Sequence, residues 1–482
     1  MYLKHLMLML NMGLHAVFIR ALSKHPLVLI VSFDGFRYNY FNKNVTPTLE
    51  SLKLNGTYTM YMKNVFQTKT FPNHHSIATG VYPEVHGVLA PQVYDPKYKT
   101  ILKYSYELWH YNEDILPIWI VNEKAGDGRH SGTMMWPGSD FKYQDTSPTF
   151  QMNFNVSVPW ERRVDTALEW FLDPVTPANL VMLYVEEPDA SAHVFGPESQ
   201  QVLKQIAKVD SLTGYLRERL RAAGLLGLMN VFQVSDHGMD TVSLDRIINL
   251  TGLVDSSTYE LDGVSPVLGL IPVPGAEDQI YAALKNASLR EHFEVYRRAE
   301  VPERWHFARN RRAPPLLAVA DEGYAFDDFF ASRDRYIHHY NVSPSANVTF
   351  GMHGYDNSQL DMLPFFLAWG PAVRRGHTVP PFDTVDLFPL WAHLLGVACP
   401  PGNGSLEHVR GILAAGPPSL LAAYIITLVV AVAFAAVVVA FVLYRRNKQG
   451  FMVLSYRKMG DLADAGPEDM IEGQHLLSIA ED

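Results

Sequence analysis

Short apolar runs alternate with longer amphipathic stretches through the central part of the chain. Residues 26–32 read PLVLIVS, and comparable runs follow at 178–184 and 230–235. Continuous apolar runs of this length are typical of strands that are covered on both faces. Between the last two runs, residues 201–220 space their apolar side chains three or four positions apart, as one face of a helix requires. The pattern therefore predicts strand–helix–strand units.

Such units predict an α/β fold in which a mostly parallel sheet is sandwiched by helices. The alternation weakens from about residue 244 to residue 349, where prolines become frequent. We interpret that segment as an inserted, cap-like subdomain within one domain that spans residues 24–410. Because ligands of such sheets bind at the carboxyl ends of the strands, functional residues are expected directly after the apolar runs.

The longest apolar segment lies near the C-terminus. Residues 420–443 carry no charge, and at ~1.5 Å per residue they can cross a hydrocarbon layer of ~30 Å. Arg445, Arg446 and Lys448 follow at once, and the positive-inside rule places such residues in the cytosol. We therefore expect one transmembrane helix over residues 420–444, a single-pass type I topology and a cytoplasmic tail at 445–482.

Both ends of the chain carry targeting patterns. Residues 1–23 combine Lys4 with a largely apolar stretch and small residues, which is typical of a signal peptide, although a strand and helix of the globular domain is an alternative. In the tail, residues 456–459 (YRKM) and 472–477 (EGQHLL) resemble sorting signals that adaptors bind, with a plain solvated tail as the alternative. We expect a location in the plasma membrane or in an endosomal or secretory membrane.

Eight Asn-x-Ser/Thr triplets all precede the apolar segment, which favours a glycosylated, exported face. The predicted glycosylation sites are Asn44, Asn55, Asn155, Asn249, Asn286, Asn341, Asn347 and Asn403.

Composition narrows the possible functions. The 482 residues include 40 Lys and Arg against 50 Asp and Glu, a net charge of −10, which argues against binding to a nucleic-acid polymer. The one cysteine, Cys399, excludes an intramolecular disulfide and a multi-cysteine zinc site. An exported domain of this kind must rely on core burial, glycans and metal for its stability.

Carboxylates and imidazoles gather where the apolar runs stop. Asp34 ends the first run, and Asp189 and His193 follow the second, where a helical turn would place both on one face. Aspartate and histidine in these numbers, without cysteine, favour a site for two zinc or similar ions that hold a phosphoryl group. The candidate metal ligands are Asp34, Asp189, His193, Asp236, His237 and His353.

Thr70 indicates the class of reaction. It lies in the segment KTFPNHHS, just before a predicted helix in which Pro72 suits the first turn. The free N–H groups at such a helix start favour an anion, and a metal-bound threonine oxygen can attack phosphorus. An ordinary helix cap is the alternative for Thr70 considered alone.

Five motifs together resemble one known family. SFDGFR, KTFPNH, EEPDASAH, SDHGM and MHGYDN occur in the order typical of the ectonucleotide pyrophosphatase/phosphodiesterases of the alkaline phosphatase superfamily. The resemblance spans roughly residues 27–400 and is greatest to the short, single-domain members, particularly the fourth and fifth. It implies an alkaline-phosphatase-like fold.

The resemblance also implies roles for individual residues. One Zn²⁺ would be held by Asp189, His193 and His353. A second Zn²⁺ would be held by Asp34, Asp236, His237 and Thr70. Thr70 would attack the phosphorus and form a phosphothreonine intermediate, while Phe71 and Tyr184 would enclose the base of a nucleotide.

One position departs from the family pattern. Where the family has an asparagine that steadies a phosphate oxygen, this chain has Pro91, which offers no donor. Loss of one such donor typically costs ~10²–10³ in rate, and we expect the neighbouring Gln92 to reach back as a substitute.

These observations predict a zinc-dependent ectoenzyme that hydrolyses nucleotide pyrophosphate or phosphodiester bonds, with an extracellular nucleotide or dinucleotide as substrate. Two alternatives stay open. One is a lysophospholipid or choline-phosphate diesterase, because short relatives include lipid-cleaving enzymes. The other, suggested by Pro91, is a cell-surface binding protein with a weakened catalytic site.

Overall fold

The computed structural model describes residues 22–340, 349–415 and 428–448. The predicted signal peptide, the sorting motifs of the tail and the sequons at Asn341 and Asn347 lie outside the described residues. The described residues up to Ala414 form one compact unit, and residues 428–448 belong to a second unit.

The central sheet has eight strands in the order β18-β2-β17-β8-β1-β7-β5-β6. β1 pairs in parallel with both β7 and β8, so the three predicted strands are confirmed and are direct neighbours. β17 runs antiparallel to both β8 and β2, which makes the sheet mixed. The strands are β1 Leu27–Phe33, β2 Thr57–Thr59, β5 Ser131–Met134, β6 Phe150–Met152, β7 Leu180–Val185, β8 Met229–Val234, β17 Phe366–Trp369 and β18 His377–Val379.

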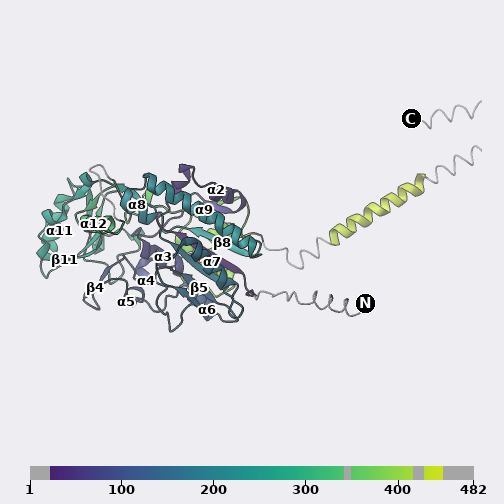
Figure 1. Ribbon diagram of the computed structural model, residues 1–482, viewed down its shortest axis with the longest axis horizontal. Helices are drawn as coiled ribbons and strands as arrows, with labels where there is room; N and C mark the ends of the chain where they lie inside the picture. The colour runs from purple at the N-terminus through teal and green to yellow at the C-terminus, as the bar shows by residue number, and fades with distance from the viewer. Residues whose placement is uncertain (1–21, 341–348, 416–427, 449–482) are drawn as a thin grey trace, which may run out of the picture. The chain divides into compact units, whose positions relative to one another are not determined.

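Helices cover both faces of this sheet, as predicted. Leu29 and Val31 of β1 point into a core with the helices α2, α7 and α9, whereas Val28 and Ile30 face α3, α6 and α13. Figure 1 shows α7 and α9 crossing the sheet on one face. The helices are α2 Pro47–Asn55, α3 Thr70–Thr79, α6 Ile118–Lys124, α7 Trp160–Phe171, α9 Gln200–Ala222 and α13 Leu387–Leu395. α9 therefore matches the predicted helix closely.

A second, antiparallel sheet lies within the segment that the sequence marks as an insertion, at the end of the domain that carries β11 and α11 in Figure 1. One face packs against α11 in a separate core, and the other packs against loops of residues 66–109 and 301–313. The subdomain boundaries themselves stay a prediction. The elements are β11 Tyr259–Val264, β12 Val267–Pro272, β13 Phe293–Arg297, β14 Leu316–Ala320, α11 Glu277–Ala287 and α12 Phe329–Tyr340.

Short elements complete the domain and bring loops to the carboxyl edge of the main sheet. β16 pairs antiparallel with β9, and β3 pairs with β4. They are β3 Val93–Asp95, β4 Thr100–Leu102, β9 Asp240–Val242, β10 Ile247–Ile248, β15 Ala325–Phe326, β16 Phe350–Met352, α4 Pro83–His86, α5 Tyr106–Trp109, α8 Asp189–Phe195, α10 Leu250–Leu253 and α14 Leu406–Val409.

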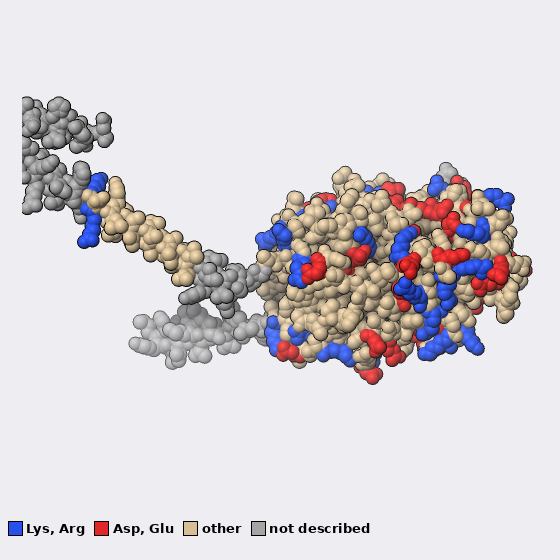
Figure 2. Space-filling model, turned by 180° about the vertical axis from the view of Figure 1, so that it is seen from behind, with Lys and Arg blue, Asp and Glu red and all other residues tan. Residues whose placement is uncertain are grey.

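The predicted membrane segment is helical where it is described. Leu428–Lys448 is a helix of 21 residues, long and apolar enough to cross a membrane. Figure 2 shows its charged side chains confined to one end, where Arg445, Arg446 and Lys448 lie. Within the described residues it is the one helix of this length and composition.

Candidate active site

Three predicted ligands converge because β8, β1 and β7 are adjacent parallel strands that end at the same edge. Asp34 follows β1, Asp236 follows β8, and Asp189 begins α8 after β7. The chain passes closely here, since the Asp189 N–H donates to the Asp34 carbonyl at 3.1 Å. Gly35 adopts a φ of +66°, and a Cβ at this position would lie 2.8 Å from the Asp189 Cβ. Glycine is therefore required at this turn.

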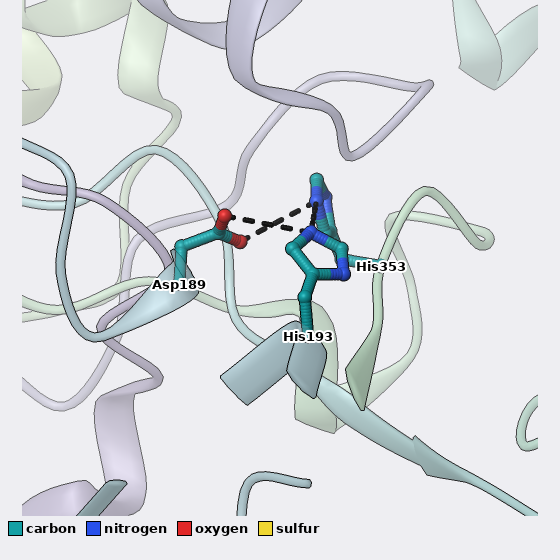
Figure 3. A group of neighbouring side chains, drawn as sticks. All are labelled: Asp189, His193 and His353. Carbon is teal, nitrogen blue, oxygen red and sulfur yellow. Dashed lines mark hydrogen bonds and ion pairs between the residues drawn. The ribbon is translucent and has the colours of Figure 1, made fainter. Parts of the chain in front are cut away.

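The first candidate metal group is Asp189, His193 and His353. α8 places His193 one turn after Asp189, as predicted, with 3.4 Å between His193 Nε2 and Asp189 Oδ2. His353 follows β16, which is distant from α8 in the sequence, and its Nε2 lies 3.4 Å from Asp189 Oδ1. Figure 3 shows both imidazoles turned toward the Asp189 carboxylate.

A second group adjoins the first and shares Asp189 with it. Asp34, Asp189 and His237 offer ligand atoms within 4.8 Å of one another. His237 Nε2 lies 3.3 Å from Asp34 Oδ1 and 3.1 Å from Asp236 Oδ2. Thr70, the first residue of α3, places its Oγ1 3.3 Å from the same nitrogen. All seven residues predicted to bind metal thus lie in one cluster.

Hydrogen bonds orient the three imidazoles of the cluster. Each Nδ1 faces a backbone carbonyl that can only accept, at 3.0 Å for His193, 2.8 Å for His353 and 2.8 Å for His237. Each Nδ1 must therefore donate, which leaves each Nε2 lone pair directed at the cluster. His193 Nε2 and His353 Nε2 are only 3.0 Å apart. Two lone pairs at this distance repel each other unless a cation lies against both, so the donor set fits a metal ion.

The carboxylates of the cluster also fit a bound cation. Asp34 Oδ1 and Asp189 Oδ1 are buried and accept no hydrogen bond from the described part of the chain. Burial and the neighbouring carboxylates raise the pKa of Asp34 and of Asp189 well above the usual range. Burial also lowers the pKa of His193 to about 3, so this imidazole is neutral. Neutral imidazoles, beside carboxyl groups whose ionised form is costly in the chain alone, are what a divalent cation stabilises.

A cavity of about 750 Å³ opens over this cluster. Phe71 and Tyr184 both line it, as the predicted base-binding role requires. Tyr184 is 7% exposed, and its hydroxyl donates to Asp34 Oδ2 at 2.5 Å. Phe154 lines the same cavity and is 57% exposed. The sequence reasoning missed Phe154, which presents a more accessible ring than Tyr184.

The predicted substitute for the missing asparagine is engaged elsewhere. Pro91 and Gln92 line the cavity, but Gln92 Nε2 donates to the Gly263 carbonyl at 2.9 Å. This bond ties the loop to β11 and engages the amide nitrogen that the predicted role requires. The geometry gives no support to Gln92 as a phosphate ligand.

His74 is a further residue of the site to which the sequence reasoning gave no role. Its Nδ1 lies 3.2 Å from Asp236 Oδ2 and 2.9 Å from the Thr70 carbonyl. Its Nε2 lies 2.9 Å from Ser32 Oγ. His74 is one helical turn after Thr70 on α3, a spacing that could have marked it as facing the same site.

Comparison with known proteins gives this geometry a context. Residues 28–356 match the family described as type I phosphodiesterase / nucleotide pyrophosphatase. The chain is 39% identical over 401 residues to ectonucleotide pyrophosphatase/phosphodiesterase family member 5 of Homo sapiens, covering 82% of this chain and 79% of the relative. It is 38% identical over 395 residues to the bis(5'-adenosyl)-triphosphatase ENPP4 of Homo sapiens, covering 81% and 83%.

A solved structure agrees. Murine ectonucleotide pyrophosphatase/phosphodiesterase 5, an inactive variant in complex with AMP, matches with a TM-score of 0.73 and 38% identity over 81% of this chain and 100% of that chain. The chain belongs to the type I phosphodiesterase / nucleotide pyrophosphatase family and is a phosphodiester hydrolase by class. Its similarity to members four and five confirms the resemblance drawn from the motifs.

Proposed function

We propose that this chain hydrolyses nucleotide pyrophosphate or phosphodiester bonds with two Zn²⁺ and Thr70 as the nucleophile. The observation that carries the proposal is the meeting of unprotonated imidazole nitrogens and buried carboxylates beside a threonine hydroxyl, at the floor of a cavity. Asp189, His193 and His353 would hold one ion. Asp34, Asp236 and His237 would hold the other, together with Thr70.

Bound divalent cations in such a pair lower the pKa of a coordinated hydroxyl and offset charge on phosphoryl oxygens. The chain itself supplies the nucleophile and its orientation. Thr70 Oγ forms a bond to phosphorus while the bond from phosphorus to the leaving oxygen breaks, which gives a phosphothreonine. A water molecule then attacks the same phosphorus and releases Thr70. His74 holds the first turn of α3 in place by its contacts with the Thr70 carbonyl and Asp236.

Aromatic side chains favour a nucleotide as the substrate. Phe71 and Phe154 line the cavity, and stacking of a base on an aromatic ring is worth ~1–3 kcal/mol. Tyr184 lines the same cavity and orients Asp34 through its hydroxyl. The named activity of the ENPP4 relative and the AMP complex of the murine structure support an adenine nucleotide or dinucleotide.

We further propose that the domain is exported and anchored by Leu428–Lys448. That helix carries its positive charges at the C-terminal end, which the positive-inside rule places in the cytosol. All six sequon asparagines in the described residues are exposed and thus available for glycans. Surface biotinylation together with a glycosidase-dependent shift in electrophoresis tests both points, and an unshifted, unlabelled chain would exclude them.

The decisive experiment uses the purified full chain in detergent, with and without Zn²⁺. We expect it to split diadenosine triphosphate and nitrophenyl nucleotide esters and to bind about two zinc ions per chain. Thr70→Ala should abolish turnover while zinc binding remains, and Thr100→Ala, at an exposed position of β4, is the matched control. Lysophosphatidylcholine tests the lipid alternative. Zinc binding without turnover of any substrate would instead indicate a binding protein.

A further inference from the structure

The cavity over the metal cluster extends beyond the aromatic residues assigned above to the base of a nucleotide. Its volume is about 750 Å³, within the range of sites that enclose most of a bound organic ligand. A separate part of its lining, here called the second wall, comes from α12, β16 and the end of β11. The second wall consists of six residues without charge, Val264, Ser265, Phe329, Ser332, Gly351 and Met352.

The second wall and the base-binding residues belong to different cores of the domain. Phe71 packs against Trp109, with 5.3 Å between the ring centroids, at the core of the loops of residues 66–109. Phe329 and Met352 belong to the core around α11. In the view of Figure 1, α8 and α12 lie above α3, whereas α5 lies below it. A base held at Phe71 would therefore leave the second wall to another part of the substrate.

The direction of the reaction points the leaving half of the substrate toward the second wall. Phosphoryl transfer proceeds roughly in line, so the leaving oxygen departs on the side of phosphorus opposite the nucleophile. Thr70 Oγ1 contacts His237 of the second metal group. In a two-metal site the attacking and leaving oxygens lie at different ions, so the leaving oxygen falls at the first group, which contains His193 and His353.

The elements that hold the first metal group also carry the second wall. The His193 Nδ1–H donates to the Gly351 carbonyl at 3.0 Å, and β16 leads directly into His353. α12 packs against α8, and the ring of Phe329 lies 5.4 Å from the ring of Phe350 in β16. A leaving group released at the first metal group would therefore meet α12 and β16.

The composition of the second wall suits an uncharged, polarisable group. Phe329 contributes an aromatic side chain, and Met352 contributes a thioether, which makes favourable contacts with aromatic rings. The Ser332 hydroxyl can pair with the heteroatoms of a base or a ribose. The acyl chain of a lysophospholipid would use the apolar surfaces, but it has no heteroatom for this hydroxyl. A nucleoside therefore matches the wall better than an acyl chain.

We propose that α12 and β16 form a second subsite, which binds the nucleoside of the leaving half of a dinucleotide. The proposal rests on the nucleotide-cleaving function proposed above. It adds a recognition surface for the part of the substrate that lies beyond the phosphates, and it makes Phe329 and Ser332 residues that determine specificity.

The test compares two ligands of equal charge in the Thr70→Ala background, with the full chain in detergent and Zn²⁺. Diadenosine triphosphate and the γ-methyl ester of ATP share one adenosine and three phosphates and differ in the second nucleoside. The dinucleotide should bind about 10-fold more tightly, because its second base contacts the wall. Ser332→Trp, which fills the subsite with a large side chain, should abolish this difference and leave the Kd for AMP unchanged.

Two further variants keep the comparison interpretable. Ala331→Trp places the same side chain at the neighbouring, exposed position of α12 and should leave all three Kd values unchanged. Phe329→Leu keeps an apolar side chain without the ring and should reduce the same difference if Ser332→Trp fails to fold. Equal affinities in the parent, an unchanged difference in the variants, or an equal loss for all three ligands would overturn the proposal.

Turnover separates this proposal from the proposed function. With Thr70 intact, Ser332→Trp should lower kcat/KM for diadenosine triphosphate about 10-fold and leave that for the γ-methyl ester unchanged. If Ser332→Trp instead lowers cleavage of lysophosphatidylcholine alone, the wall binds an acyl chain and the nucleoside subsite is refuted. Wild-type protein that cleaves neither nucleotide would refute the proposed function, whereas the binding comparison would still test the subsite.

Discussion

Two buried groups of charged side chains in this domain differ in how their charge is balanced. In the first, Asp95 of β3 meets Arg312 at 2.7 Å and Arg311 at 2.9 Å. Arg312 is fully buried and also donates to the carbonyls of Gly87 and Leu108 at 2.8 Å each. Although burial raises the pKa of Asp95, hydrogen bonds from both arginines bring it down to about 2.

The second group is the candidate active site. Asp34 and Asp189 face neutral imidazoles, and the pKa of each carboxyl is driven up by burial and by neighbouring carboxylates. Within the residues that the structure describes, no arginine or lysine forms a direct ion pair with either carboxylate, and Lys69 acts on Asp189 only at longer range. The Asp95 group is therefore complete within the chain, whereas the active-site group requires a cation from outside. The contrast separates a structural ion pair from a binding site by charge balance alone.

The largest effect is expected from Asp189→Asn. Loss of this proposed ligand of one ion, which also belongs to the adjoining candidate group, should lower turnover by ~10²–10³-fold. In metal-free protein the same change removes a carboxyl group whose ionisation is disfavoured by burial and by Asp236, so it should raise the free energy of unfolding at neutral pH. Turnover assays and urea unfolding with and without Zn²⁺ measure both effects, and a destabilised metal-free variant would contradict the contrast.

Asp95→Asn should have the opposite effect on stability. It leaves the buried Arg312 without its anion and should lower the free energy of unfolding by ~3–5 kcal/mol. Because the pKa of Asp95 is depressed, this difference between wild type and variant should be present above pH ~4 and disappear toward pH ~2. Zinc content at a temperature where the variant is folded should match wild type.

Chelation should distinguish the active-site group from the Asp95 group without a mutation. Removal of zinc by a chelator should abolish turnover and lower Tm, because a ligand present at 100 to 1,000 times its Kd stabilises the folded state by about 3–4 kcal/mol. Calorimetry of the Asp189→Asn variant should show a smaller shift on chelation than wild type. Equal shifts in both proteins would mean that Asp189 contributes nothing to metal binding.

The smallest effect concerns Asp262 of β11, a buried carboxylate. Among the described residues it has no arginine partner, and it does not belong to the candidate metal groups. Burial raises its pKa to about 7, although it accepts the Tyr94 N–H at 2.8 Å. The folded state thus binds a proton more readily than the unfolded state, so this group makes stability fall as pH rises from 5 to 7. Asp262→Asn should remove about 2 kcal/mol of that fall. Urea midpoints of both proteins at pH 5 and pH 7 measure it.

The sequence predicts the centre of this molecule better than its periphery. β1, β7, β8 and α9 were identified because buried strands and a long amphipathic helix leave strong periodic patterns. The short β2 and β18 leave almost none, so their places in the mostly parallel sheet, and the antiparallel β17 between β2 and β8, were not predicted.

The residues of the candidate site were likewise predicted only in part. Asp34 and Asp236 directly follow strands, so their meeting could be predicted from the rule that parallel strands end at one edge. The bond from Lys69 to Ser265 joins residues 196 positions apart, and the bond from Gln92 to Gly263 joins residues 171 apart. No periodicity relates such segments, which is why neither contact could be predicted from the sequence.

The order of the ligands along the chain has a consequence for biosynthesis. The first proposed ligand, Asp34, is followed by the last, His353, only after nearly the whole domain has been synthesised. Neither metal group is complete before β7 has joined β1 in the sheet, and the first group also waits for β16. Metal binding would therefore stabilise the completed sheet and would not guide the early steps of folding. In a secretory compartment, zinc uptake would act as a late checkpoint that distinguishes completed chains from partly folded ones.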